Sequence, residues 1–122
     1  MEFYINQGST LPLLKMQLNY DGKSSLDEFN RMIAESNIFF SMKKVDDGLF
    51  KILNKPCGIT NKIFIEPNSP TEYYIYYKFT QRDTDTNGRY EGEFLIRTDS
   101  GIIILPITEK LFINIGEKFV ID

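Results

Sequence analysis

The chain has 122 residues, 42% of them hydrophobic and 25% charged, which suits one folded domain with a single modest core. It contains no histidine and one cysteine, so Ser-His-Asp and Cys-His nucleophiles and structural zinc sites with nitrogen or sulfur ligands are excluded. Its net charge of -3 offers no broad electrostatic footprint for nucleic acid. We therefore expect a single non-catalytic domain over residues 1–122, without a cofactor or a metal.

Alternation of apolar and polar residues with a period of two runs through most of the chain, which is typical of strands that bury one face. The predicted strands, in chain order, cover residues 14–18, 37–42, 49–53, 73–79, 90–96, 102–105 and 111–115. Turn residues separate them, and Asp47-Gly48 is expected to supply the positive φ of a tight hairpin. Several short strands divided by turns predict an all-β sandwich or barrel.

Two segments depart from this pattern. Apolar residues recur at spacings of three and four over residues 26–34, and Ser25 is placed as an N-cap, so a short helix that crosses between the sheets is predicted there. The segment from Pro56 to Pro70 is rich in proline, which predicts a loop around a short strand at residues 63–65.

Targeting signals and the cysteine bear on where the protein is found. The first residues lack a basic flank and a long apolar stretch, so no secretory signal is expected, and no apolar run is long enough to span a bilayer. Cys57 has no partner in the chain, which fits a reducing cytoplasm. We interpret Cys57 as a half-buried, unreactive thiol, because no basic residue with a switchable pKa is present to activate it.

The segment 83–88, Asp-Thr-Asp-Thr-Asn-Gly, begins like a calcium-binding loop, with oxygen ligands at alternate positions and a glycine at the sixth. Such a loop requires a bidentate carboxylate at its twelfth position, which is Phe94 here. Glu93 is one residue away, and on an alternating strand that offset points to the opposite face. We therefore predict no metal here, and we expect Glu91 and Glu93 to be solvated surface charges.

A structural corner is the better interpretation of this segment. Asp83 and Asp85 are expected to bend the connection by bonding nearby backbone, and Gly88 accepts a conformation that other residues resist. Tyr90 is placed like the tyrosine of the corner found in immunoglobulin-like sandwiches, with its ring inward and its hydroxyl on the preceding connection. Asp83, Asp85, Gly88 and Tyr90 are thus predicted to hold the fold together.

Exposed aromatic and apolar residues supply the candidate contact surfaces. Tyr74 and Tyr76 form an outward stripe, for which we favour protein contact, since tyrosine is enriched at interface centres. Stacking on sugar rings and an ordinary half-buried strand surface are the alternatives. The apolar segments at the two termini are either edge strands or arms that dock on a neighbouring subunit. The candidate interface residues are Phe3, Tyr4, Ile5, Tyr74, Tyr76, Phe119, Val120 and Ile121.

Several short motifs follow one another along the chain in an order that resembles a known family. They are Gln7-Gly8-Ser9-Thr10-Leu11-Pro12-Leu13-Leu14, Ile38-Phe39-Phe40-Ser41-Met42, Tyr76-Tyr77-Lys78-Phe79, the block from Asp83 to Phe94, and Gly101 through Pro106. Their order and spacing, from about residue 5 to 115, resemble the immunoglobulin-like domain at the N-terminus of phage baseplate upper proteins. Phe79 stands where that family usually has a tryptophan.

The resemblance implies an immunoglobulin-like antiparallel β-sandwich with one short crossover helix, a core over residues 5–115 and a terminal arm over 116–122. It also implies a non-catalytic virion structural protein of the baseplate, tail or capsid, assembled in the host bacterial cytoplasm. The implied partners are other virion proteins and copies of itself, with neither nucleic acid nor a membrane. The alternative is a carbohydrate-binding module that aids adsorption to a host-surface glycan, with Tyr74, Tyr76 and the loop 56–70 as its platform.

Overall fold

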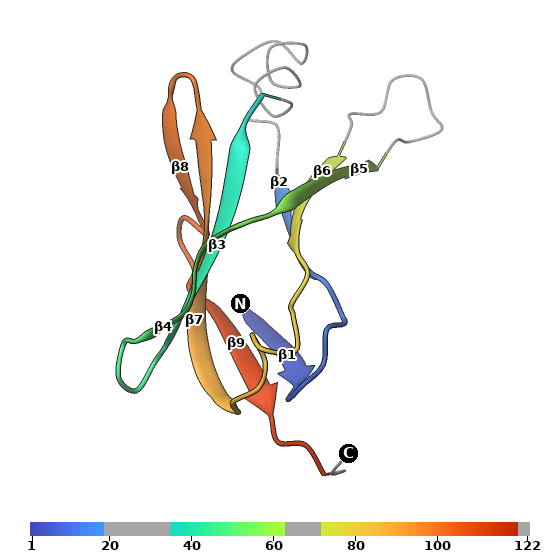
Figure 1. The fold of residues 1–122 in the computed structure, drawn as a ribbon. Coiled ribbons are helices and arrows are strands. Elements are labelled where there is room, and N and C mark those ends of the chain that lie inside the picture. Colours follow the sequence, from blue (N-terminus) through green and yellow to red (C-terminus); the bar gives the residue numbers. More distant parts are fainter. Residues whose placement is uncertain (19–34, 63–71, 120–122) are drawn as a thin grey trace.

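The computed structural model describes residues 1–18, 35–62 and 72–119 (Figure 1). Within these ranges the chain is all β, with no helix. The strands are β1 (Glu2–Asn6), β2 (Leu14–Leu18), β3 (Asn37–Lys44), β4 (Phe50–Pro56), β5 (Gly58–Lys62), β6 (Glu72–Tyr77), β7 (Gly88–Thr98), β8 (Gly101–Leu105) and β9 (Leu111–Gly116). The predicted crossover helix over 26–34 and the predicted strand at 63–65 lie outside the described residues.

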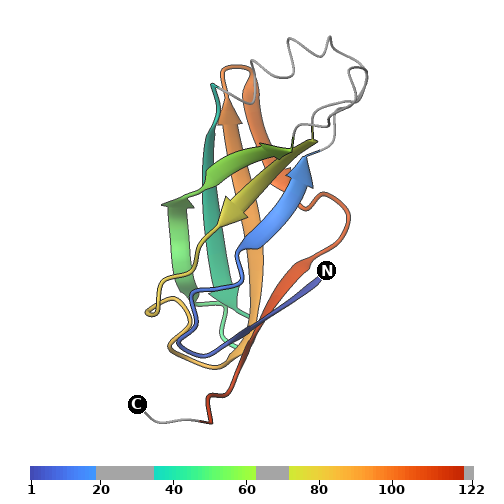
Figure 2. The same ribbon diagram turned by 90° about the vertical axis from the view of Figure 1, so that its right-hand side faces the viewer.

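The strands form two sheets that face each other in a sandwich-like arrangement (Figures 1 and 2). The large sheet has the order β1-β9-β7-β3-β4, and β8 also pairs with β7. The small sheet has the order β2-β6-β5. β7 is long enough to pair with β9 through its first half and with β8 through its second half. β7 is therefore the strand of the large sheet that pairs with three others, β3 on one edge and β9 and β8 on the other.

One strand contradicts the prediction of an entirely antiparallel sandwich. β1 runs parallel to β9, with Phe3 opposite Ile113 and Ile5 opposite Ile115, so the large sheet is mixed. The alternation of apolar residues reveals which face of a strand is buried, but it does not reveal the direction of the neighbouring strand.

The core lies between the two sheets and is built by the residues that alternate inward. Phe40 of β3 is at its centre, with its ring centroid 4.9 Å from those of both Tyr77 and Phe94. Phe79 packs edge-on against Phe40 at 6.1 Å. The buried apolar side chains are Ile5, Leu14, Met16, Ile38, Phe40, Met42, Ile52, Ile75, Tyr77, Phe79, Tyr90, Phe94, Ile96, Leu111, Ile113 and Ile115. Aromatic rings from facing sheets thus fill the centre of the sandwich.

The strands predicted from alternation are all present, with small differences at their ends. Gly48, in the hairpin between β3 and β4, has the positive φ predicted for it, 71°. The predicted loop from Pro56 to Pro70 is wrong over residues 58–62, which form β5, and its remainder from residue 63 lies outside the described residues. β4 and β5 are edge strands of their sheets, and edge positions tolerate proline and glycine that a central strand excludes.

Candidate functional site

Tyr90 joins the start of β7 to the connection that precedes it. Its side chain is buried, and its hydroxyl donates a hydrogen bond to the carbonyl oxygen of Thr86 at 3.0 Å. Burial raises the pKa of Tyr90. Gly88, two residues earlier, has φ 142°, which residues with a side chain rarely adopt. Both contacts expected of a tyrosine corner, the inward ring and the hydroxyl bond to the connection, are therefore present.

Asp83 is buried in the same connection, with 2% of its surface exposed. Its carboxylate accepts hydrogen bonds from the Tyr77 hydroxyl at 2.6 Å and from the Thr80 amide at 2.9 Å, and the Lys55 ammonium lies 3.3 Å away. Burial alone would raise the pKa of Asp83, but the hydrogen bonds from Thr80 and Tyr77 and the charge of Lys55 outweigh it and hold the pKa below its usual range. Asp83 therefore joins β4, β6 and the connection into β7.

Thr84 and Asp85 tie this connection to the segment between β1 and β2 and to β4. The Thr84 hydroxyl donates to the Ser9 carbonyl at 2.9 Å, and the Gly8 amide donates to the Thr84 carbonyl at 2.9 Å. The hydrogen bond from Lys51 lowers the pKa of Asp85. Among the described residues, no buried side-chain nitrogen or oxygen lacks a hydrogen-bond partner. The polar residues of this connection are thus satisfied by the fold itself.

The outer face of the large sheet, which points away from the small sheet, has a different character (Figure 1). Phe39 of β3 is opposite Leu95 of β7, which is opposite Ile104 of β8, so the three side chains form one cross-strand line. We call Phe39, Leu95 and Ile104 the apolar row. Phe39 and Leu95 are half-buried, Ile104 is 49% exposed, and Ile102 beside it is 57% exposed.

Opposite charges flank the apolar row on β7. Glu93 lies two residues before Leu95 and Arg97 lies two residues after it, so all three project from the same face of the strand. Both charged side chains are exposed. Neither makes a hydrogen bond or an ion pair within the part of the chain that the structure describes. The outer face therefore presents one carboxylate and one guanidinium on either side of an apolar centre.

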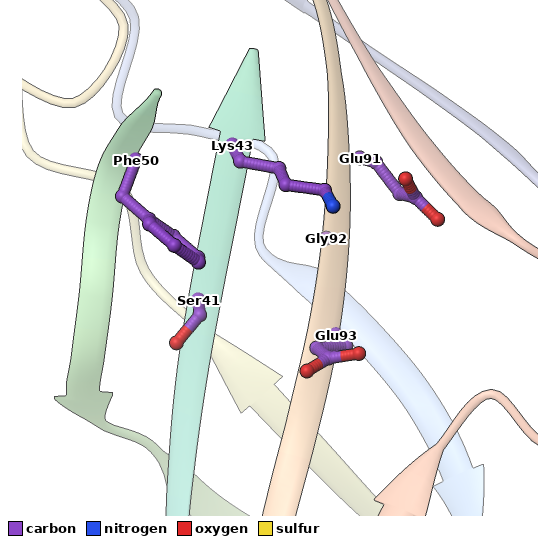
Figure 3. Close-up of a pocket in the computed structure, with 6 residues that line it drawn as sticks. All are labelled: Ser41, Lys43, Phe50, Glu91, Gly92 and Glu93. Carbon is purple, nitrogen blue, oxygen red and sulfur yellow. The ribbon is translucent and has the colours of Figure 1, made fainter. Parts of the chain in front are cut away.

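A shallow pocket of about 90 Å³ lies on the same face, nearer the hairpin between β3 and β4 (Figure 3). Lys43 extends from β3 toward β7, between Phe50 of β4 and the two glutamates of β7, Glu91 and Glu93. Phe50 is 57% exposed. The volume is well below the roughly 300 Å³ at which ligand pockets begin. The pocket is thus a recess in a surface and too small to enclose a metabolite.

Tyr74 and Tyr76 lie on the outer face of the small sheet, on the far side of the sandwich from the apolar row. They project from its central strand, β6, and their neighbours on β2 are Gln17 and Lys15. Both rings are half-buried, and a Cβ atom added to Gly58 on β5 would collide with the ring of Tyr76. Tyr76 therefore lies across the backbone of the edge strand.

The terminal segments fall into different settings. Phe3 and Ile5 belong to β1 and face the core, where Phe3 stacks on Phe79 at 5.9 Å, whereas Tyr4 is 69% exposed. Phe119 follows β9 and is 97% exposed. Val120 and Ile121 lie outside the described residues.

Cys57 is half-buried between β4 and β5, and burial raises the pKa of its thiol to about 12. A thiol with so high a pKa carries almost no thiolate at neutral pH and is a poor nucleophile. The position and the pKa of Cys57 both match the expectation of an unreactive thiol.

Comparisons with known proteins return no matching family model, no matching curated protein and no matching solved structure. In residues 1–18, 35–62 and 72–119, no group of three or more histidine, cysteine, aspartate or glutamate side chains is placed to hold a metal ion. The same ranges contain no helix that is long and apolar enough to cross a membrane.

The apolar row was not predicted from the sequence, although Glu93 beside it was expected to be an exposed surface charge. Phe39 and Leu95 stand at outward positions of alternating strands, where polar residues are expected, and Ile102 and Ile104 have no polar residue between them. These departures from alternation are the signal that the sequence offered. Bringing them into one line requires the register of three strands, which the sequence pattern does not supply.

Proposed function

We propose that this chain is a non-catalytic structural protein of a tailed-phage particle, and that it works through protein–protein contacts made by the outer face of the large sheet. The observation that carries the contact surface is the apolar row with Ile102, four outward apolar side chains on adjacent strands. Contiguous exposed apolar side chains with a polar surround are typical of interaction sites. The assignment to a phage particle rests on the resemblance of motif order described above.

We further propose that the sandwich is immunoglobulin-like. The order β9-β7-β3-β4 in one sheet and β2-β6-β5 in the other corresponds to strands G-F-C-C′ and B-E-D of an immunoglobulin variable-type domain. Tyr90 occupies the tyrosine-corner position at the start of the strand that corresponds to F. On this assignment β8 is an extra strand inserted in the F–G connection. The outer face is then the G-F-C-C′ face, extended by β8.

The experiment for the virion assignment is quantitative mass spectrometry of purified phage particles that carry the gene. We expect the protein in the particles at a copy number that matches a symmetry of the capsid, tail or baseplate. Particles carrying Leu95→Asp, which places a charge in the apolar row, should contain much less of it. Absence of the wild-type protein from purified particles would refute the proposal.

A carbohydrate-binding module is the second candidate, and the placement of Tyr74 and Tyr76 favours it. Two aromatic side chains two residues apart on a central strand, with Lys15 and Gln17 alongside, offer a flat surface for sugar rings and polar groups for their hydroxyls. A glycan array tests it. A defined hit that is lost in Tyr76→Ala and kept in Tyr4→Ala, a matched exposed tyrosine, would favour adsorption; no hit would dismiss it.

A further inference from the structure

We propose that the outer face of the large sheet docks onto a second copy of this chain, about a two-fold axis that runs along the apolar row. The inference deepens the proposed function by naming the partner, and it rests on the outer face being a contact surface. It is carried by two features on that face: the apolar row and the charges on either side of it.

The charges on β7 select the orientation of the second copy. Glu93, Leu95 and Arg97 project from one face at intervals of roughly 7 Å, twice the rise per residue of a strand. When two such faces pack with their β7 strands antiparallel and Leu95 on the axis, each Glu93 lies opposite Arg97 of the second copy. The contact then contains two equivalent ion pairs, as a two-fold interface requires.

The opposite orientation is disfavoured by the same charges. An axis parallel to the strands would place Glu93 against Glu93 and Arg97 against Arg97. Juxtaposed like charges at an interface cost several kcal/mol and suppress the wrong pairing. The sequence of charge, apolar residue and opposite charge along β7 is therefore self-complementary in one direction only.

The apolar row supplies the centre of this interface. Phe39, Leu95 and Ile104 lie across three adjacent strands, so an axis along them sets each residue against the same row of the second copy. On β3, the same axis sets Ser41 opposite Asn37, which brings together polar side chains that carry no charge. Twisted sheets pack face to face at about 30°, so the rows nearest the axis stay in contact while distant rows diverge.

The area of this face is that of a small interface. The strands β4, β3, β7 and β8 lie side by side and have 7, 8, 11 and 5 residues. At about 4.8 Å between strands and about 3.3 Å per residue, these strands offer roughly 490 Å². A standard interface buries about 800 Å² on each partner, so we expect a dimer that dissociates on dilution.

Charge reversal tests both the surface and the orientation, with sedimentation equilibrium as the measurement. We expect the wild-type protein to be a dimer, and Glu93→Arg and Arg97→Glu each to weaken dimerisation at least about tenfold. The double variant, Glu93→Arg with Arg97→Glu, restores the opposite pairing and should recover most of the wild-type affinity. Glu117→Arg and Lys78→Glu make the same changes of charge away from the outer face and should leave the dimer unchanged.

Two results would overturn the inference. A wild-type protein that stays monomeric at every accessible concentration shows that the partner is not a second copy. A dimer whose dissociation constant is unchanged by both single reversals shows that the outer face is not the contact. This result is expected if two copies pair through the edges of β8. Either failure is separable from failure of the proposed function, because incorporation of the wild-type protein into particles is measured independently of its self-association.

Discussion

The polar groups in the connection that leads into β7 are paired within the chain, whereas the charged groups farther along the outer face of β7 are exposed and unpaired among the residues that the structure describes. In the connection that leads into β7, the Asp83 carboxylate is buried and accepts two hydrogen bonds, and the Tyr90 hydroxyl is bonded to the backbone. On the outer face farther along β7, Glu93 and Arg97 have no partner within the described part of the chain and flank exposed apolar side chains. Buried polar groups that are hydrogen-bonded within the chain stabilise the fold, whereas exposed charges beside an apolar surface are available to pair with the charges of a second molecule.

The largest expected effect comes from Asp83→Ala, which removes the shared partner of Tyr77, Thr80 and Lys55. The Tyr77 hydroxyl would be left buried without its acceptor, so we expect a loss of about 3 kcal/mol in the free energy of unfolding. Urea denaturation measures it. Asp46→Ala removes an exposed carboxylate from a turn and serves as the control; equal losses in the two variants would contradict the role assigned to Asp83.

The dependence of stability on pH isolates the charge of Asp83. Its pKa is lowered in the folded state, so its contribution is fully present above the unfolded pKa of about 3.9 and is lost as pH falls through the folded pKa. The difference in unfolding free energy between the wild type and Asp83→Asn should therefore shrink below about pH 4. A difference that stays constant down to pH 2.5 or rises on acidification, measured by denaturation at a series of pH values near and below about 4, would show that the carboxylate charge does not stabilise the fold.

Gly92 lies on β7 between the two regions and tests how closely its inner face is packed. A Cβ atom there would come within 2.7 Å of the Ile113 Cδ1 atom and 2.9 Å of two ring atoms of Phe40. We expect Gly92→Ala to destabilise the protein by about 2 kcal/mol through overpacking. Thermal unfolding checks this. An unchanged melting temperature would mean that Phe40 of β3 and Ile113 of β9 can shift to accommodate the methyl group without loss of stability.

Tyr90→Phe removes only the hydroxyl that bonds Thr86. We expect a loss of about 1 kcal/mol, the net value of one hydrogen bond whose acceptor is left partly buried. Tyr4→Phe makes the same chemical change at an exposed position and should have no measurable effect on the unfolding midpoint. If the two variants unfold alike, the corner bond does not contribute to stability.

The outer face should show the smallest effect on stability. Ile104→Thr alters a half-exposed side chain of the apolar row, for which we expect a change within about 0.5 kcal/mol. The same variant should weaken self-association, because Ile104 would be buried only in the dimer. Denaturation and sedimentation on one preparation separate the two effects. A large loss of stability with unchanged self-association would show that Ile104 stabilises the fold and does not belong to the contact between copies.

Local patterns predicted much of the fold, and non-local pairing accounts for the rest. Alternation located β2 to its end residues, and the spacing from Gly88 to Tyr90 predicted the contact that the Tyr90 hydroxyl makes. The parallel direction of β1 depends on its pairing with β9, at the other end of the chain, which no local pattern reports.

The candidate site was harder to predict for the same reason. Tyr74 and Tyr76 could be identified as a candidate surface from the sequence because they are aromatic and lie two residues apart on one strand. Phe39, Leu95 and Ile104 come from three strands, and each alone resembles an ordinary exposed apolar residue, of which folded proteins have many. Only the register that sets them side by side turns them into a surface.

Hydroxyl-radical footprinting of the wild-type protein, compared between dilute and concentrated samples, tests the central claim most directly. The account predicts that oxidation of Phe39, Leu95 and Ile104 falls on concentration, while oxidation of Tyr74 and Tyr76 does not change. Protection of the two tyrosines with no protection of the outer face of the large sheet would contradict it.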